Sequence, residues 1–158
     1  MFTIGELTFG ILICNDSNYY EPAHIIAAKG AAALFIPTNN GLPPTKAAPE
    51  LVAETRNVDV ARAMENSVAV IRADVAGQAE GLLSYGTSAI VDRDGNVLQT
   101  ARQMQSDLIV ADIKPIARKH RRGWDTARNS AVMREYLRLR TDGATEIEDS
   151  SVTHGKFT

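Results

Sequence analysis

The sequence has few of the features that assign a chain quickly to a class. Only one of its 158 residues is a cysteine, Cys14, so no disulfide can form within the chain, and a reducing cytoplasm is the expected compartment. An excess of charge of one sign is also lacking. The net charge of −2 at pH 7 gives no reason to expect nucleic acid or an acidic membrane surface as a partner.

Long apolar runs are absent as well. No run approaches the roughly 20 residues that a membrane-spanning helix needs. The apolar start, MFTIGELTFGILIC, is interrupted by Glu6 and lacks a basic segment and a small-residue cleavage site, so we do not expect a signal peptide. Three scattered histidines and one cysteine offer no metal-ligand spacing, and we expect neither a metal nor a cofactor.

What the sequence does have is the composition of an ordinary globular domain. Hydrophobic residues make up 44% and charged residues 23%, and a chain of this length can bury a real core. The last stretch, TDGATEIEDSSVTHGKFT, shows no periodicity. We therefore expect one folded domain over residues 1–140 and a mobile polar tail over 141–158.

Strand-like and helical patterns alternate in the first half of the chain. Residues 8–14 and 32–37 are short apolar runs that predict buried strands, with a helix from Pro22 to about Gly30 between them. A second helix is predicted from about Pro49 to Asn66, followed by a strand at 67–74. This alternation predicts an α/β fold built on a parallel strand–helix–strand unit.

The second half predicts further strands and one basic helix. Asp94-Gly95 separates strands at 85–92 and 96–101, which is a strong hairpin signal, and 107–113 (DLIVADI) predicts a last strand. Residues 116–140 are basic with helical periodicity. We interpret them as a solvated amphipathic helix rather than a nucleic-acid site.

Cys14 stands where the first apolar run ends, and its residues alone leave two interpretations open. A free cysteine is often a buried core residue, and the end of a strand is an ordinary place for one. The carboxyl ends of parallel strands also gather ligands, however, and the turn and helix start that follow would favour a thiolate and could receive an oxyanion.

Four blocks of the sequence carry a resemblance that bears on this choice. They occur in order over about residues 8–113: GILICNDSNYYEPAHIIAAKGAAALFIPTNN (10–40), ARAMENSVAVIRADVAG (61–77), GTSAIVDRDGNVL (86–98) and DLIVADI (107–113). Together they resemble the carbon–nitrogen hydrolase (nitrilase) superfamily. The resemblance implies a four-layer α-β-β-α sandwich and hydrolysis of non-peptide C–N bonds through a thioester, with a Glu-Lys-Cys triad.

The same resemblance assigns expected roles to residues of this chain. Cys14 matches the nucleophile, and the backbone N–H of Asn15 matches part of the oxyanion hole. Tyr19, Asn39 and Asn40 are candidate substrate contacts, although turn chemistry explains the two asparagines equally well. Structural support of the turn, the helix start and the scaffold is expected from Asp16, Glu21, Arg62, Glu65 and Asn66.

The chain departs from the family pattern before Cys14. The family's Glu and Lys precede the cysteine, whereas here only 13 residues do so; none is a lysine, and Glu6 lies on or beside the same strand. The chain thus resembles the C-terminal portion of the domain, with residues 1–140 as a partial carbon–nitrogen hydrolase domain. We expect either a homo-oligomer or a complementing N-terminal half.

Two functions follow as hypotheses. The first is an amidase or carbamoylase-like hydrolase acting on a small amide or carbamoyl substrate, inactive as this fragment. The second is a catalytically silent interaction or assembly module with the same fold. Other candidates are weaker: His24 and His120 are expected to be surface or satisfied residues, and Ser84 lacks the Gly-x-Ser-x-Gly of a nucleophile elbow.

Overall fold

Two compact units make up the chain, Met1–Lys119 and His120–Thr158. The computed structural model describes residues 1–113, 134–135 and 138, and every element below belongs to the first unit. The helix expected over 116–140 and the tail expected over 141–158 lie outside the described residues, except for residues 134–135 and 138, which are helical.

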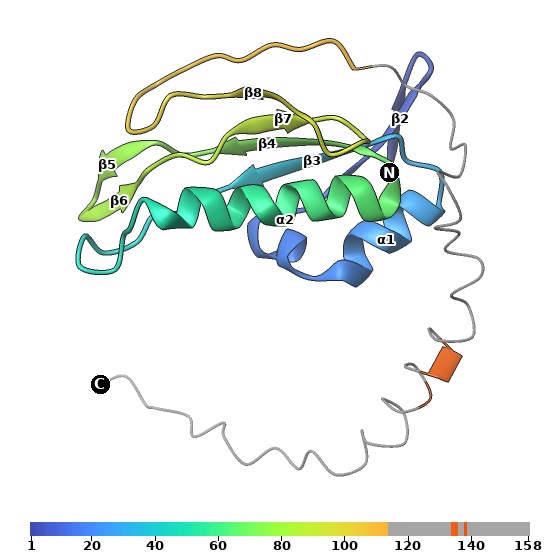
Figure 1. Cartoon of the computed structure of the whole chain (residues 1–158), viewed down its shortest axis with the longest axis horizontal. Coiled ribbons are helices and arrows are strands. Elements are labelled where there is room, and N and C mark those ends of the chain that lie inside the picture. The colour runs from blue at the N-terminus through green and yellow to red at the C-terminus, as the bar shows by residue number, and fades with distance from the viewer. Residues whose placement is uncertain (114–133, 136–137, 139–158) are drawn as a thin grey trace, which may run out of the picture. The chain divides into compact units, whose positions relative to one another are not determined.

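A six-stranded mixed sheet forms the centre of the first unit (Figure 1). The strand order is β1-β2-β3-β4-β7-β8, in which β2, β3 and β4 are parallel and the other pairs are antiparallel. The strands of the sheet are β1 (Phe2–Ile4), β2 (Leu7–Ile11), β3 (Ala33–Thr38), β4 (Ala69–Asp74), β7 (Ala89–Val91) and β8 (Val97–Thr100). A separate hairpin consists of β5 (Gly77–Ala79) and β6 (Leu82–Ser84).

Helices join the parallel strands, as the alternating pattern predicts. The 3-10 helix η1 (Cys14–Asn18) and helix α1 (Tyr20–Ala28) connect β2 to β3, and helix α2 (Glu50–Asn66) connects β3 to β4. Helix α1 packs against β2, where a Cβ at Gly10 would collide with the side chain of Ile26. A glycine at this position therefore allows the helix to approach the strand closely.

The core lies between the helices and one face of the sheet. Small residues face the sheet from the helices, which keeps the layers close, and branched residues of β3, β4 and β7 fill the space between them. Burying each Leu, Ile or Val side chain contributes about 1.5–3 kcal/mol. The cluster consists of Leu12, Ala23, Ala27, Leu34, Ile36, Ala63, Val68, Val70 and Val91.

The other face of the sheet is apolar too, and no helix among the described residues covers it (Figure 1). We call it the open sheet face. Strand pairing places Ile11, Phe35, Ile71 and Ile90 in one row across four strands. A ring cluster continues this face towards the edge: Phe2 stacks on Phe9 at 5.5 Å and Phe9 meets Phe35 edge-on at 5.0 Å between ring centroids.

Two sequence predictions change in the structure. The strand expected over 8–14 ends at Ile11, because Cys14 adopts a φ of 48°, which a strand cannot contain. The strand expected over 107–113 does not form. Asp107 accepts hydrogen bonds from the backbone and side chain of Arg102, and the segment beyond this loop leaves Leu108 86% exposed with no strand pairing among the described residues.

The predicted hairpin over 92–96 is confirmed. Strands β7 and β8 pair antiparallel, and the Asp92 carboxylate closes the turn by accepting hydrogen bonds from the backbone N–H groups of Asp94 and Asn96. Gly95 has a φ of 86°, which explains the glycine in this turn.

Candidate active site

The carboxyl ends of the three parallel strands meet at a cavity of about 350 Å³. Cys14 follows β2, Asn39 and Asn40 follow β3, and Arg72 lies near the end of β4. Crevices at this end of parallel strands are the usual ligand sites of open α/β sheets. The volume suits a small molecule.

Cys14 begins the turn that follows β2, and its backbone is strained. It is half-buried and left-handed, at a φ of 48°, and its thiol lies 3.9 Å from the carbonyl oxygen of Asn39. A left-handed backbone costs a non-glycine residue about 1–2 kcal/mol, and such residues persist only where their surroundings hold them.

Local hydrogen bonds hold the Cys14 turn closed. The backbone N–H of Ile13 donates to the Asp16 carboxylate at 3.0 Å, and the N–H of Asp16 donates to the carbonyl of Ile13 at 3.0 Å. The Ser17 hydroxyl donates to the carbonyl oxygen of Cys14 at 2.8 Å. The amide of Asn18 donates to the side chain of Asn15 at 3.0 Å, so the two asparagines beside the cavity support each other.

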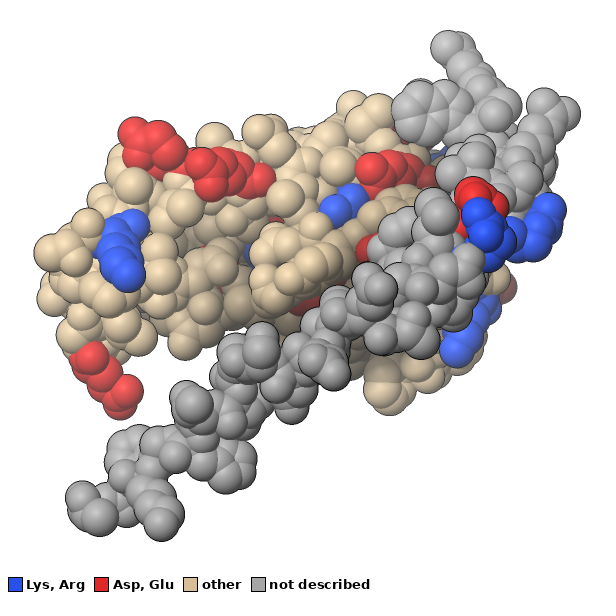
Figure 2. Space-filling model, turned by 90° about the horizontal axis from the view of Figure 1, so that it is seen from below, with Lys and Arg blue, Asp and Glu red and all other residues tan. Residues whose placement is uncertain are grey.

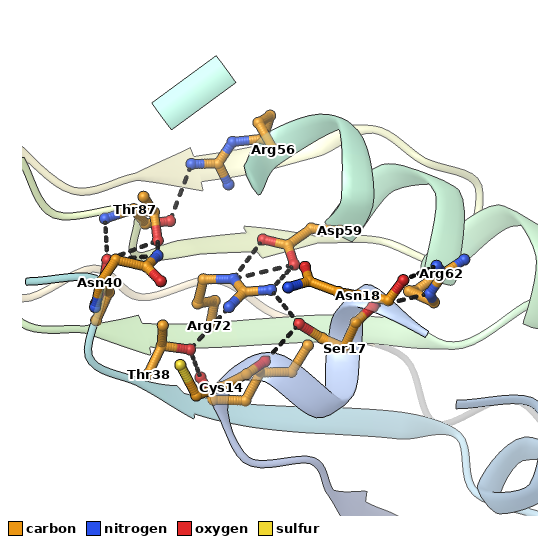
Figure 3. Close-up of polar contacts among 12 residues, drawn as sticks. Cys14, Ser17, Asn18, Thr38, Asn40, Arg56, Asp59, Arg62, Arg72 and Thr87 are labelled. Carbon is orange, nitrogen blue, oxygen red and sulfur yellow. Dashed lines mark hydrogen bonds and ion pairs between the residues drawn. The ribbon is translucent and has the colours of Figure 1, made fainter. Parts of the chain in front are cut away.

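A buried ion pair lies directly beneath this turn (Figure 3). The guanidinium of Arg72 donates from Nη2 to Asp59 Oδ1 at 2.6 Å and from Nε to both carboxylate oxygens at 3.0 Å. It also donates to the hydroxyls of Ser17 at 2.9 Å and Thr38 at 2.8 Å. Because Ser17 in turn holds the carbonyl of Cys14, the ion pair positions the cysteine turn from below.

Helix α2 grips the other end of the same turn through Arg62. Its Nε donates to the carbonyl of Ser17 at 2.9 Å and its Nη2 to the carbonyl of Asn18 at 3.1 Å, while Nη1 pairs with Glu65 at 2.7 Å. Asn66 donates to the carbonyl of Arg62 at 3.0 Å. The last carbonyls of η1 thus have donors from a helix that lies far away in the sequence.

The loop after β3 is tied to the turn before β7 by the carboxylate of Asp74. It accepts hydrogen bonds from the backbone and amide of Asn40 at 3.0 and 3.2 Å, and from the backbone and hydroxyl of Thr87 at 3.0 and 2.8 Å. Gly86 precedes Thr87 with a φ of 79°, and a Cβ there would lie 2.7 Å from the Cβ of Ala76. Only glycine fits this position without displacement.

Arg56 lies on α2 beside this network. Its Nη2 donates to the carbonyl of Thr87 at 3.3 Å, and its Nη1 is buried without a hydrogen-bond partner among the residues described. Burial lowers the pKa of Arg56, and the charge of Arg72 acts in the same direction against the opposing effect of Asp59.

The structure brings together four of the residues predicted for the site. Cys14, Asn15, Asn39 and Asn40 all line the cavity. Tyr19 does not line it; this residue is 57% exposed at the start of α1. The supporting positions Asp16, Arg62, Glu65 and Asn66 make the contacts given above, and Glu21 lies half-buried in the first turn of α1.

The weaker sequence candidates lie elsewhere. His24 stacks on Tyr20 at 4.8 Å between ring centroids, its Nδ1 lies 3.1 Å from the Asn66 side chain, and it does not line the cavity. Ser84 donates its hydroxyl to the carbonyl of Val75 at 2.7 Å. His120 lies outside the described residues.

Sequence reasoning missed one wall of the cavity, which helix α2 provides. Leu51, Glu54, Thr55 and Val58 line it at positions i, i+3, i+4 and i+7, the spacing of a single helix face. That spacing is legible in the sequence. The membership of Arg72 is not, because its strand pattern predicts an apolar residue there.

Several features of other site classes are not found in the described part of the chain. No group of three or more His, Cys, Asp or Glu residues there could hold a metal ion. No helix there is long and apolar enough to span a membrane. On the face shown in Figure 2, the coloured acidic and basic side chains lie in small separate groups.

Comparison with known proteins decides the family. The family model described as carbon–nitrogen hydrolase matches residues 1–121. The chain belongs to the carbon–nitrogen hydrolase family. Its sequence is 31% identical over 113 residues to a nitrilase of Pyrococcus abyssi, an alignment that covers 72% of this chain and 39% of the relative.

Solved structures of the carbon–nitrogen hydrolase family share the fold. A carbon–nitrogen hydrolase from Helicobacter pylori G27 superposes with a TM-score of 0.62 at 21% identity, covering 87% of this chain and 47% of the other. An amidase from Nesterenkonia sp. AN1 gives a TM-score of 0.68 at 24% identity, covering 86% and 48%. The predicted nitrilase-type α/β fold is thus confirmed, and the chain spans less than half the length of these relatives.

Proposed function

We propose that Cys14 is the nucleophile of a hydrolase that cleaves the C–N bond of a small amide or carbamoyl compound. One observation carries the proposal: a strained cysteine, at a φ of 48°, lines a cavity at the carboxyl ends of three parallel strands. Strain of this kind, held by a network of buried hydrogen bonds, is characteristic of functional sites. In support, the Nesterenkonia amidase is described as carrying an active-site cysteine that acrylamide modifies.

The chemistry assigned to Cys14 proceeds in two steps. The thiolate attacks the carbonyl carbon, the C–N bond breaks, and the nitrogen leaves as ammonia or an amine after taking up a proton, which leaves a thioester. Water then attacks the thioester, releasing the acid and restoring the thiol. The backbone N–H of Asn15 is the proposed donor to the oxygen anion that forms in each step.

This chain alone lacks the proton-handling groups that both steps need. The expected Glu and Lys of the family triad have no match before Cys14. Loss of a general base lowers a rate by roughly 10²–10⁴, and loss of one group that stabilises the oxyanion lowers it by about 10²–10³. The chain by itself is therefore expected to show negligible turnover.

We further propose that the missing groups come from a complementing N-terminal half, whose sheet covers the open sheet face. The face is apolar and exposed, with Phe2 at 54% and Ile11 at 42%. An exposed row of this kind marks an interaction surface or an aggregation hazard. The relatives are more than twice as long as the parts of them that match, which leaves room for such a half.

The mass of the natural polypeptide tests the complementing half. Intact-mass spectrometry that finds about twice the 17.1 kDa of this chain would place the half in the same polypeptide. A polypeptide of 17.1 kDa that sediments as a stable homodimer, and whose open sheet face is protected from hydrogen exchange, would overturn it.

Alkylation of Cys14 tests the nucleophile directly, because the chain has no second thiol. Iodoacetamide should label the folded chain at pH 7 at least as fast as the chain unfolded in urea, whose thiol is only a few per cent ionised. A folded chain that reacts more than tenfold slower would contain a buried structural thiol. That result would favour the silent assembly module, for which the open sheet face is the supporting observation.

A turnover assay completes the test. Ammonia release from small amides should be undetectable with the purified chain, and the assembly isolated from the natural source should release ammonia. Cys14→Ala should abolish that activity, and Ser84→Ala, which changes a hydroxyl bonded only to the backbone, should retain it. Activity that survives Cys14→Ala would contradict the proposal.

A further inference from the structure

Two charged side chains line the cavity, Arg72 and Glu54, and they differ in how far their charge is compensated. Arg72 faces the carboxylate of Asp59 at 2.6 Å, and both side chains are almost wholly buried. The positive charge is therefore cancelled within the wall of the cavity. Little of it is available to a substrate.

Glu54 is not compensated. It is exposed on the face of α2 that lines the cavity, and it makes no hydrogen bond or ion pair with any residue that the structure describes. A hydrated carboxylate in such a position keeps its charge and has free acceptor oxygens.

The charged groups packed around the cavity do not reverse this sign. Asp74 adds a second carboxylate behind the loop, held by Asn40 and Thr87. Arg56 lies two positions from Glu54 on the helix, donates to the carbonyl of Thr87, and is not part of the lining. The cavity thus presents one free charge to a ligand, and that charge is negative.

We propose that Glu54 makes the cavity select amides or carbamoyl compounds whose other end carries a positive charge, such as an ammonium or guanidinium group, and reject those that carry a carboxylate. The selection rests on the proposed function only in that the substrate enters beside Cys14. A cationic nitrogen donates charge-assisted hydrogen bonds to the free carboxylate, and a like charge is repelled.

Charged thiol reagents measure this selection on the full chain without requiring turnover. A methanethiosulfonate transfers its thioalkyl group to the Cys14 thiolate and releases methanesulfinate. The rates are compared for a cationic trimethylammonium-ethyl reagent, an anionic sulfonatoethyl reagent and a neutral methyl reagent. Each rate is divided by that of the chain unfolded in urea, which removes the intrinsic reactivity of the reagent.

The cation-to-anion rate ratio should exceed one in the natural chain and fall roughly 5- to 25-fold in Glu54→Gln, the change expected for unit charges about 4–8 Å apart in water. The ratio cancels any change in access or in the thiolate fraction, because these affect all reagents alike. Glu50→Gln removes the same charge one turn earlier on α2, at a position that does not line the cavity, and should leave the ratio unchanged.

The two proposals fail in different ways. A ratio that stays within twofold of the natural value in Glu54→Gln overturns the role of Glu54, even when Cys14 is reactive. An equal fall in Glu50→Gln overturns it too, because the effect would then come from the general field of the helix. Failure of the neutral reagent to label the folded chain instead overturns the proposed nucleophile.

Discussion

Replacing Asp59 by asparagine should destabilise the fold more than any other loss of a single charge in the described part of the chain. The variant keeps the shape of the side chain but removes the negative charge beneath Arg72. The pair is shielded from water, since the side chains are 2% (Arg72) and 0% (Asp59) exposed. Arg72 would then be a buried cation without a counter-charge.

The magnitude follows from this burial. Removing one partner of a buried pair costs about 3–5 kcal/mol, because the remaining charge has neither water nor a partner. The whole fold is worth only about 5–15 kcal/mol. At about 4 °C per kcal/mol, the melting temperature should fall by about 12–20 °C.

The assay is urea unfolding followed by far-ultraviolet circular dichroism, with a double variant as the internal check. Asp59→Leu combined with Arg72→Met should lose less stability than Asp59→Asn alone, because a buried pair can be replaced by apolar side chains at little cost. Ser17 and Thr38 lose only a donor in the double variant, since each hydroxyl still donates to a backbone carbonyl.

A matched single change sets the scale. Glu65→Gln removes the partner of Arg62 in a half-exposed pair, and Arg62 keeps its bonds to the turn, so the loss should stay below about 1 kcal/mol. If Asp59→Asn costs no more than Glu65→Gln, the account of a buried, structure-determining ion pair is refuted.

Three further predictions concern other elements. Gly10→Ala should cost about 1–3 kcal/mol of unfolding free energy, because its Cβ would overlap Ile26; an unchanged urea midpoint would contradict this close packing. Cys14→Gly should be more stable than Cys14→Ala by about 1 kcal/mol, since glycine adopts the left-handed backbone without strain, and equal midpoints would count against strain. The pKa of Asp92 is lowered, because burial, which alone would raise it, is outweighed by hydrogen bonds from Asn96 and from the backbone of the turn. The ionised form is thus the stabilising one, so the stability lost in Asp92→Ala at pH 7 should vanish as the pH falls through the folded-state pKa, below 3.8; a loss that persists at about pH 2 would contradict the sign.

The parts of the fold that the sequence predicts correctly are those governed by local patterns. The strand–helix–strand units follow from apolar runs of strand length separated by a helical period. The β7–β8 hairpin follows from Asp94-Gly95, where the turn needs a positive φ. Each of these signals lies within one element or one turn.

The parts that fail depend on distant partners. The alternating residues 107–113 have the pattern of a strand but no neighbouring strand to pair with among the described residues, and the Asp107–Arg102 contact closes a loop before them. The short β5–β6 hairpin has too few residues to produce a pattern.

The candidate site divides in the same way. The position of Cys14 at a strand end is visible in the sequence, and so is the helix face that carries Glu54. The ion pair beneath the turn is not visible, because Asp59 and Arg72 occupy a helix and a strand whose patterns call for apolar residues. Only the approach of α2 to β4 in three dimensions makes two charges acceptable there.

The long sequence separation within the Cys14 turn has a consequence for synthesis. Ser17, which fixes the carbonyl of Cys14, depends on an arginine 55 residues further along the chain. At about 5–20 residues per second, a ribosome needs roughly 3–11 s to add that length. Throughout that interval the nascent thiol is an ordinary, unpositioned one, and the strained turn closes only when the strand of Arg72 has emerged.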